Sequence, residues 1–337
     1  MQALPEKTPP PLPLPGIIPA LMQGFNIAAT NVHLILLPVM LDVLLWLSPR
    51  LGVAQLLTPT LGELAALILK AVPADKVEAV TQYFAQSQAD LEQLNLLSQL
   101  STFPVGVPTL LPLTDFKSAP YGTPLTIQLG GVLPLVGGAV FFIIVGWLLG
   151  SLYFGAVARV ASDSAEPFSL RTSVRHFIQV AALSLLLLGL TLLVVTPGSL
   201  LASALMFTAP MLAQFLMFFT IFMVVWLIIP LLFSPLGIFT HQMNAITALL
   251  NSWRLMRFYL PTGGMFIMIA AVLGLGLDML WRVPGTASWL LVVGILGHAF
   301  IYTALIAAAF VFFRGGMKVM QSRQSLRPPI ERPLLKL

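Results

Sequence analysis

The chain has 337 residues, of which 58% are hydrophobic and only 9% are charged, and its mean hydropathy is +0.95. A soluble domain usually carries about 25% charged residues, so this composition excludes an ordinary water-soluble fold. The chain contains no cysteine, which excludes disulfides, thiolate metal sites and a cysteine nucleophile. The formal charge of +5 does not point to nucleic acid as a partner, because the basic residues flank apolar runs and control membrane topology instead.

Six apolar runs are long enough to cross a bilayer, which takes about 20 helical residues for roughly 30 Å of hydrocarbon. We therefore predict an all-α polytopic membrane protein with one isolated first span and a five-helix bundle within 130–315. Pro38, Pro134 and Pro230 lie inside predicted spans and are expected to kink them. The six predicted spans cover residues 28–48, 130–157, 177–197, 205–235, 261–281 and 288–313.

The connecting segments are alternately rich and poor in lysine and arginine. In membrane proteins the segments rich in these residues face the cytoplasm. The turn at 198–204 carries no charge, and the turn at 282–287 carries one arginine. This pattern predicts a protein of the cytoplasmic (inner) membrane with both termini in the cytoplasm and the long segment 49–129 outside. The basic segments are 158–176, 236–260 and the C-terminal tail 316–337.

Residues 1–27 read as a proline-rich cytoplasmic tail and the approach to the first span, without the basic start and cleavage site of a signal peptide. In the outer segment, Thr60 and Glu63 have the spacing of a capping box and predict the start of a short helix that ends at Pro73. A second helix with one apolar stripe should follow, up to about Leu100. Prolines then recur, which predicts an extended stretch laid over a surface.

Four ionisable residues and one amide fall inside or at the edge of the predicted spans, where such groups default to functional candidates. Asp42 and Asp278 are expected near the outer ends of their spans, with Arg282 one helical turn after Asp278. We expect Asp42 to form an ion pair with Arg282 in the outer leaflet. His298 is expected roughly 15 Å into its span by helical rise, near the midplane, and Gln214 in the outer half of the fourth span.

Two roles are possible for these polar residues. They form a structural ion-pair or hydrogen-bonded cluster between helices, or they serve transport, with His298 as a proton relay. A metal site is not expected, because no spaced set of ligands is visible.

Gly146, Gly150 and Gly155 lie on one face of the second predicted span, with Ser151 beside them. Small residues at this spacing let two backbones approach closely. We expect helix packing there, either within the bundle or between subunits.

The stretch 233–277 has a recognisable pattern. A proline (Pro235) near the end of a span is followed by an amphipathic segment that carries Ala248, Ser252, Trp253 and Arg254, and then by the next span. The pattern is similar to that of poorly characterised multi-pass bacterial proteins resembling the membrane domain of glycerophosphodiester phosphodiesterases. The resemblance covers mainly residues 170–315 and implies the fold and a bacterial membrane. It implies no activity, because the phosphodiesterase requires a separate barrel domain with metal-binding acids and histidines.

No Ser/His/Asp arrangement, HExxH motif or phosphate-binding loop occurs in the sequence, so neither an enzyme nor a cofactor is predicted. The leading functional prediction is an integral membrane scaffold or accessory subunit that organises partner proteins or lipids. The alternative is a transporter or export-permease subunit that uses Asp42, Asp278 and His298. The expected partners are the lipid bilayer and other membrane subunits, not nucleic acid.

Overall fold

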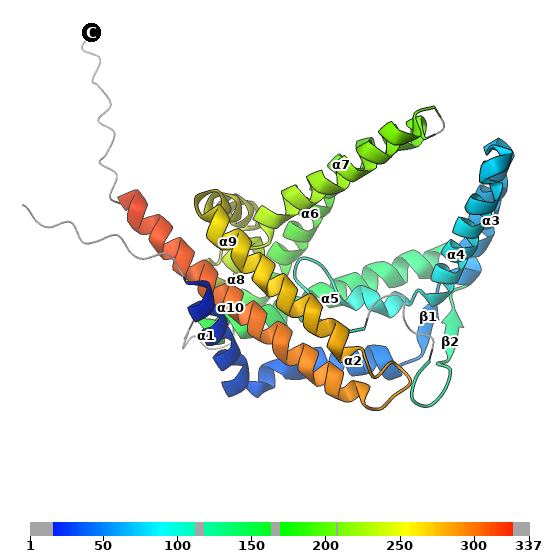
Figure 1. Ribbon diagram of the computed structural model, residues 1–337. Coiled ribbons are helices and arrows are strands. Elements are labelled where there is room, and N and C mark those ends of the chain that lie inside the picture. The colour runs from blue at the N-terminus through cyan, green and yellow to red at the C-terminus, as the bar shows by residue number, and fades with distance from the viewer. Residues whose placement is uncertain (1–15, 112–117, 163–168, 207, 326–337) are drawn as a thin grey trace, which may run out of the picture.

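The computed structural model describes residues 16–111, 118–162, 169–206 and 208–325, and these residues are helical apart from two short strands and irregular connections (Figure 1). Five helices are long and apolar enough to cross a membrane, or six if a bent pair near the N-terminus counts as one span. The prediction of an all-α polytopic membrane protein is therefore confirmed. Of the predicted tails, residues 1–15 and 326–337 lie outside the described part.

The first predicted span, 28–48, is not one helix. Helix α1 (Ile17–Thr30) is followed by a short 3-10 turn, η1 (Val32–Ile35), and by α2 (Leu36–Leu47), and the two halves meet at 89°. The break falls at Asn31, whose side-chain amide donates to the carbonyl oxygen of Ile27 at 3.0 Å. Asparagine side chains compete in this way with the hydrogen bonds of a helix. The length of an apolar run does not predict such a break.

The bent pair α1–α2 wraps along α10 (Leu291–Ser325). Gly24 lies so close to α10 that a Cβ atom there would collide with the backbone oxygen of Ala304. At the other end of the pair, the indole N–H of Trp46 donates to the carbonyl oxygen of Thr286 at 2.8 Å, and its ring meets Trp289 edge-on. The pair thus passes from the middle of α10 to the turn that precedes it.

Two of the three prolines expected to kink spans do not do so. Pro38 and Pro134 are each the third residue of their helices, α2 and α5 (Val132–Ala161). The first turn of a helix needs no intrahelical N–H, so proline is tolerated there. Pro230 does interrupt its helix. It lies in the 3-10 turn η4 (Ile229–Leu231) between α7 (Pro210–Ile228) and α8 (Ser234–His241).

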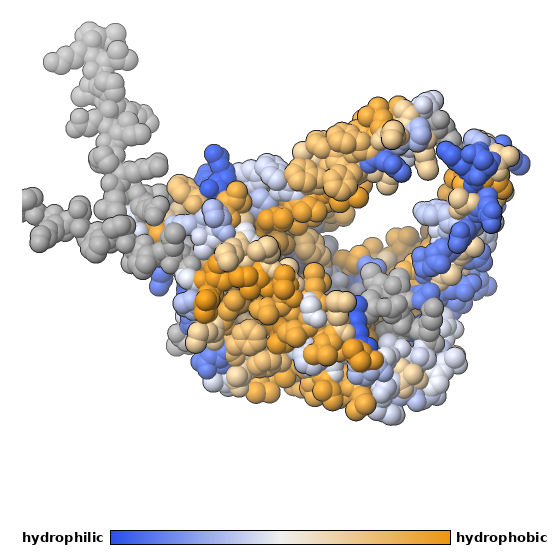
Figure 2. Space-filling model, in the orientation of Figure 1, coloured by the Kyte–Doolittle hydropathy of each residue, from blue (hydrophilic) through white to orange (hydrophobic). Residues whose placement is uncertain are grey.

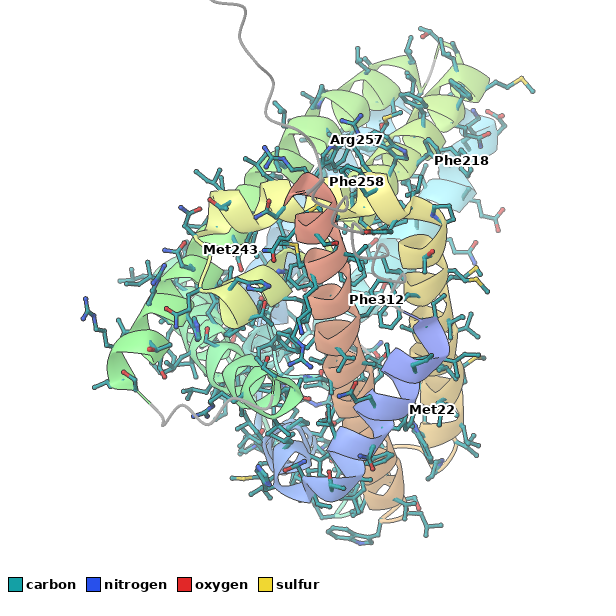
Figure 3. All side chains as sticks on the ribbon, turned by 90° about the vertical axis from the view of Figure 1, so that its left-hand side faces the viewer. Met22, Phe218, Met243, Arg257, Phe258 and Phe312 are labelled. Carbon is teal, nitrogen blue, oxygen red and sulfur yellow. The ribbon has the colours of Figure 1, made fainter. Side chains whose placement is uncertain are left out.

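Helix α9 (Ala245–Trp281) is longer than the predicted span 261–281 and bends inside. Tyr259 leaves helical geometry with φ −124° and ψ 28°, two residues before Pro261. Figure 3 shows the first part of α9, which ends near Phe258, running across the end of α10 before the helix turns to run beside it. The amphipathic segment of the sequence and the span after it are therefore one kinked helix.

The core surrounds α10. Phe266 of α9 and Phe312 of α10 stack with ring centroids 4.6 Å apart, and Phe233 packs against both. By contrast, the second half of α6 (Leu170–Leu205) and α7 form an arm that extends away from this core (Figure 1). Ala213 is the one buried residue of α7.

The segment 49–129, which was predicted to lie outside, begins and ends side by side. Strand β1 (Arg50–Gly52) pairs in parallel with β2 (Thr126–Gln128), and between them α3 (Ala54–Ala71) and α4 (Val77–Gln93) form a hairpin. The predicted capping box is wrong. Helix α3 already begins at Ala54, so Thr60 and Glu63 are interior residues.

The stretch after α4 enters the bundle instead of lying on its surface. The 3-10 turn η3 (Leu96–Leu100) leads into irregular chain in which Val105, Val107 and Leu110 are at most 1% exposed. Non-helical backbone at membrane depth is tolerated only where protein or water surrounds it. Segment 101–111 is therefore an irregular insertion into the helix bundle, which we call the inserted segment.

The glycine face of α5 makes room for this insertion. A Cβ atom on Gly146 would lie 2.6 Å from the carbonyl oxygen of Leu100, and one on Gly150 would lie 2.8 Å from that of Val105. The expected close approach of backbones therefore occurs at these two glycines. Its partner is the chain entering and forming the inserted segment, not another helix.

Candidate functional site

Asp42 occupies the point where the inserted segment meets the helices. Its side chain is fully buried, and its two carboxylate oxygens accept the backbone N–H of Leu110 at 2.9 and 3.1 Å. A buried N–H without a partner costs free energy comparable to a lost hydrogen bond, and hydrogen bonds to charged acceptors are the stronger ones. The carboxylate thus provides the partner that irregular backbone lacks inside a bundle.

Asp278 and His298 form the second part of the site, on α9 and α10. The Nδ1 atom of His298 lies 2.7 Å from Oδ1 of Asp278. The hydroxyl of Tyr302, one turn further along α10, donates to the other carboxylate oxygen at 3.1 Å. Both oxygens of Asp278 are therefore bound by side chains of one helix face, which fixes the register of α9 against α10.

A glycine creates the space for this arrangement. A Cβ atom on Gly274, one turn before Asp278, would lie 3.1 Å from the hydroxyl oxygen of Tyr302. The next residue of α10, Thr303, shares a hydrogen bond of 2.8 Å with the hydroxyl of Tyr153 on α5. Through these contacts the polar face of α10 is connected to α9 and to α5.

Asp42 and the Asp278–His298 pair lie close enough to interact electrostatically, and together they form the polar cluster of the site. His298 is 1% exposed, and its Nε2 atom has no hydrogen-bond partner among the described residues. An imidazole with one nitrogen on a carboxylate and the other unengaged is suited to carrying a proton between two sites. The same geometry also suits a structural link between helices.

The predicted ion pair between Asp42 and Arg282 is wrong. Both residues are described, yet Asp42 is bound by the backbone of the inserted segment, and no ion pair joins it to Arg282. Arg282 is exposed at the end of α9. Asp278 likewise pairs with His298 instead of Arg282. The sequence indicated charges at similar depth, but an arginine so close to the end of its helix reaches solvent.

Gln214 is not part of the cluster. It lies on α7 in the arm and is exposed. The different depths predicted for Asp278 and His298 are also wrong, because the two side chains touch. Helix α10 begins at Leu291, so His298 is seven residues, or about 10 Å by helical rise, from its start.

Gly155 lies apart from the cluster as well. A Cβ atom there would meet His176 of α6 and Phe239 of α8 at 3.9 Å, so Gly155 does not share the packing role of the other two glycines. Among the residues that the structure describes, no group of three or more histidine or acidic side chains could hold a metal ion.

Two members of the site were not among the predicted site residues. Tyr302 follows His298 at helical spacing, which puts both on the same helix face. The backbone of Leu110 could not have been found, because nothing local connects the proline-rich stretch to Asp42. The chain matches no known family, no curated protein and no solved structure, so the resemblance to the membrane domain of glycerophosphodiester phosphodiesterases stays a prediction.

Proposed function

We propose that this chain is an integral membrane scaffold or accessory subunit that binds other membrane components, partner helices or ordered lipids, in the opening beside its α6–α7 arm. One observation carries the proposal. The arm extends away from α5, and Figure 2 shows an opening between the arm, α5 and the α3–α4 hairpin. A membrane protein complete in itself would close such a gap by helix packing.

The helices beside the opening expose apolar side chains. Phe218 of α7, on the arm, is 72% exposed (Figure 3). Val140 and Ile144 of α5 are also exposed. Exposed apolar side chains are ordinary where a helix faces lipid tails. Apolar helices on two sides of an opening favour an occupant between them.

The orientation proposed for the chain is the one predicted from its basic residues, with both termini in the cytoplasm of a bacterial cell and 49–129 outside. Two features support it. The C-terminal end of α5 and the start of α6 lie at the opposite end of the molecule from β1, β2 and the α3–α4 hairpin (Figure 1). The bent pair α1–α2 also passes along α10, as a broken span would.

The orientation is tested with cysteines placed in this cysteine-free chain. Gln86 of α4 and Gln321 of α10 are both exposed. An impermeant thiol reagent applied to intact cells is expected to label Gln86→Cys and to label Gln321→Cys only after the cells are opened. The reverse pattern would overturn the orientation.

The proposed function is tested with a photo-crosslinking amino acid at Phe218, on the arm beside the opening, and at Met22, which is 68% exposed on α1. Irradiation in native membranes followed by mild solubilisation should give one defined adduct, a subunit or a lipid species, at position 218 and none at position 22. The same diffuse adducts with bulk lipid at both positions would overturn the proposal.

One observation favours a second function, that of a transporter or permease subunit. Asp278, His298 and Tyr302 form a buried hydrogen-bonded chain inside the bundle, and intramembrane ionisable groups often mark ion pathways. The two functions differ in what His298→Gln does. A transporter loses proton-coupled flux in reconstituted vesicles, whereas a scaffold keeps its crosslink at position 218.

A further inference from the structure

The first part of α9, residues 245–258, forms a surface separate from the Asp42 cluster, and we call it the crossing segment. It runs across the end of α10, where a Cβ atom on Gly316 would lie 2.9 Å from the side chain of Leu255 (Figure 3). Between its first residue, Leu291, and Gly316, α10 rises about 38 Å, whereas the hydrocarbon core of a bilayer is roughly 30 Å thick. The crossing segment therefore lies where a spanning α10 leaves the hydrocarbon.

Two pairs of tryptophans mark the two ends of the bundle. Trp253 of the crossing segment meets Trp226 of α7 edge-on, with ring centroids 5.6 Å apart. At the other end of α10, Trp46 meets Trp289 at the same distance. Tryptophan collects at the two membrane–water interfaces, because its ring is apolar and its N–H is polar. The Trp226–Trp253 pair thus independently places the crossing segment at the level of an interface.

The crossing segment is held firmly by its inner side. Ser252 is fully buried, and its hydroxyl donates to the carbonyl oxygen of Pro230 at 2.6 Å. Met256 is 1% exposed. The backbone N–H of Ala245 donates to the side-chain oxygen of Gln179 on α6 at 2.7 Å. These contacts determine which side chains of the segment face outward.

The outward side combines apolar and cationic side chains. The exposed residues that follow one another at helical spacing are Ile246, Leu250, Arg254 and Arg257. Phe258, next to the last of them, is 53% exposed. A helix that lies in the membrane interface has this combination, because its apolar side chains reach the acyl chains while its cationic groups stay among the headgroups.

The charge around these two arginines is positive. No aspartate or glutamate occurs in 170–277 or in 291–325, and no ion pair joins either arginine to an acid among the described residues. Arg314 and Lys318 lie within two residues of Gly316 on α10, so they add positive charge at the same depth. The surface therefore complements an anionic partner.

We propose that the crossing segment lies in the membrane interface and that Arg254 and Arg257 bind the phosphate groups of anionic phospholipids there. A guanidinium donates two parallel hydrogen bonds to phosphate oxygens, and basic side chains at the membrane surface favour anionic lipids. The proposal goes beyond the scaffold function, because it concerns a surface other than the opening beside the arm. It does not depend on which side of the membrane this surface faces.

The position of the crossing segment is tested with a nitroxide spin label on single cysteines of the full-length protein in lipid nanodiscs. Leu250→Cys carries the label on the outward side of the segment. Leu275→Cys carries it on an exposed position of α9 beyond the kink, and Gln321→Cys carries it on an exposed position of α10 beyond Gly316. Oxygen relaxes labels that lie among acyl chains, and a water-soluble nickel chelate relaxes labels that lie in water.

The label at Leu250→Cys should be relaxed more by oxygen than by the chelate, as at Leu275→Cys, whereas the label at Gln321→Cys should show the opposite preference. A label at Leu250→Cys that is as accessible to the chelate as the one at Gln321→Cys would place the segment in water and overturn the proposal.

The preference for anionic lipid is measured by native mass spectrometry of the full-length protein from detergent that contains equal amounts of phosphatidylglycerol and phosphatidylcholine with the same chains. Arg254→Gln, Arg257→Gln and the double variant remove exposed guanidinium groups and leave the buried side of the segment intact. Arg282→Gln is the matched control, because it makes the same change at an exposed position directly after the other end of α9. Circular dichroism and gel filtration establish that each variant folds.

The wild-type protein should retain phosphatidylglycerol over phosphatidylcholine. Each single variant should lower the ratio of the two retained lipids about fivefold, which corresponds to about 1 kcal/mol for one basic side chain near an anionic surface. The double variant should lower the ratio further, and Arg282→Gln should leave it unchanged. Equal retention of both lipids by the wild-type protein, a preference that survives the double variant, or an equal loss in Arg282→Gln would overturn the proposal.

Discussion

The carboxylate of Asp42 accepts the backbone N–H of Leu110, 68 residues further along the chain, inside the helix bundle. This single contact explains why an acidic residue interrupts a run of leucine and valine. The irregular chain around Leu110 needs an acceptor that neither lipid nor a hydrocarbon side chain could provide.

Replacing Asp42 should therefore affect stability according to what replaces it. Asp42→Leu leaves a buried N–H without an acceptor and is expected to cost about 1–3 kcal/mol of unfolding free energy. Asp42→Asn keeps an acceptor and should cost less. Thermal unfolding in detergent measures the order. Arg282→Leu serves as a control and should change little, and a loss as large as that of Asp42→Leu would revive the ion pair that the structure does not contain.

The pairing of Asp278 with His298 predicts strong coupling between the two positions. Asp278→Leu leaves His298 and Tyr302 without their carboxylate, and His298→Leu leaves one oxygen of Asp278 without its partner. Each single variant should cost about 3–5 kcal/mol. The double variant should lose clearly less than the sum of the single losses, because two apolar residues can pack together. Additive losses in chemical unfolding would show that the 2.7 Å contact contributes nothing to stability.

The glycines of α5 provide a matched set within one helix. Gly146→Ala and Gly150→Ala should destabilise the protein, since each new methyl group would lie within 3 Å of backbone atoms from 100–106. Gly137→Ala meets nothing within 4 Å and should be neutral or stabilising by up to about 1 kcal/mol through helix propensity. If all three variants unfold at the same temperature, the close approach of the inserted segment to α5 is wrong.

Sequence patterns predicted the long helices well, because an apolar run of sufficient length has few alternatives to a spanning helix. They failed where a local polar group or a distant contact decides the outcome. Asn31 breaks the first span through its own side chain, and the kink near Tyr259 joins two segments that hydropathy separates.

Three residues of the polar site were predicted, but their contacts were not. Asp42, Asp278 and His298 were singled out because charges in apolar runs are costly. Which of them touch depends on helix register and on a loop that folds back 68 residues later, and neither is encoded locally. Gln214 was predicted to belong to the buried cluster but is exposed, because the arm that carries it does not pack onto the core.

Asp42 holds the inserted segment inside the bundle through its hydrogen bonds with the N–H of Leu110. The most direct test measures the thiol reactivity of Val105→Cys in lipid nanodiscs, since Val105 is fully buried, with the exposed position Gln86→Cys as reference. Val105→Cys should react far more slowly than Gln86→Cys. Adding Asp42→Leu should raise only the Val105→Cys rate, about tenfold for a local opening eased by about 1.4 kcal/mol. Two results would show that Asp42 does not hold the segment in place. One is an equal reaction rate at the two cysteines when Asp42 is unchanged, and the other is a Val105→Cys thiol that stays protected after Asp42→Leu.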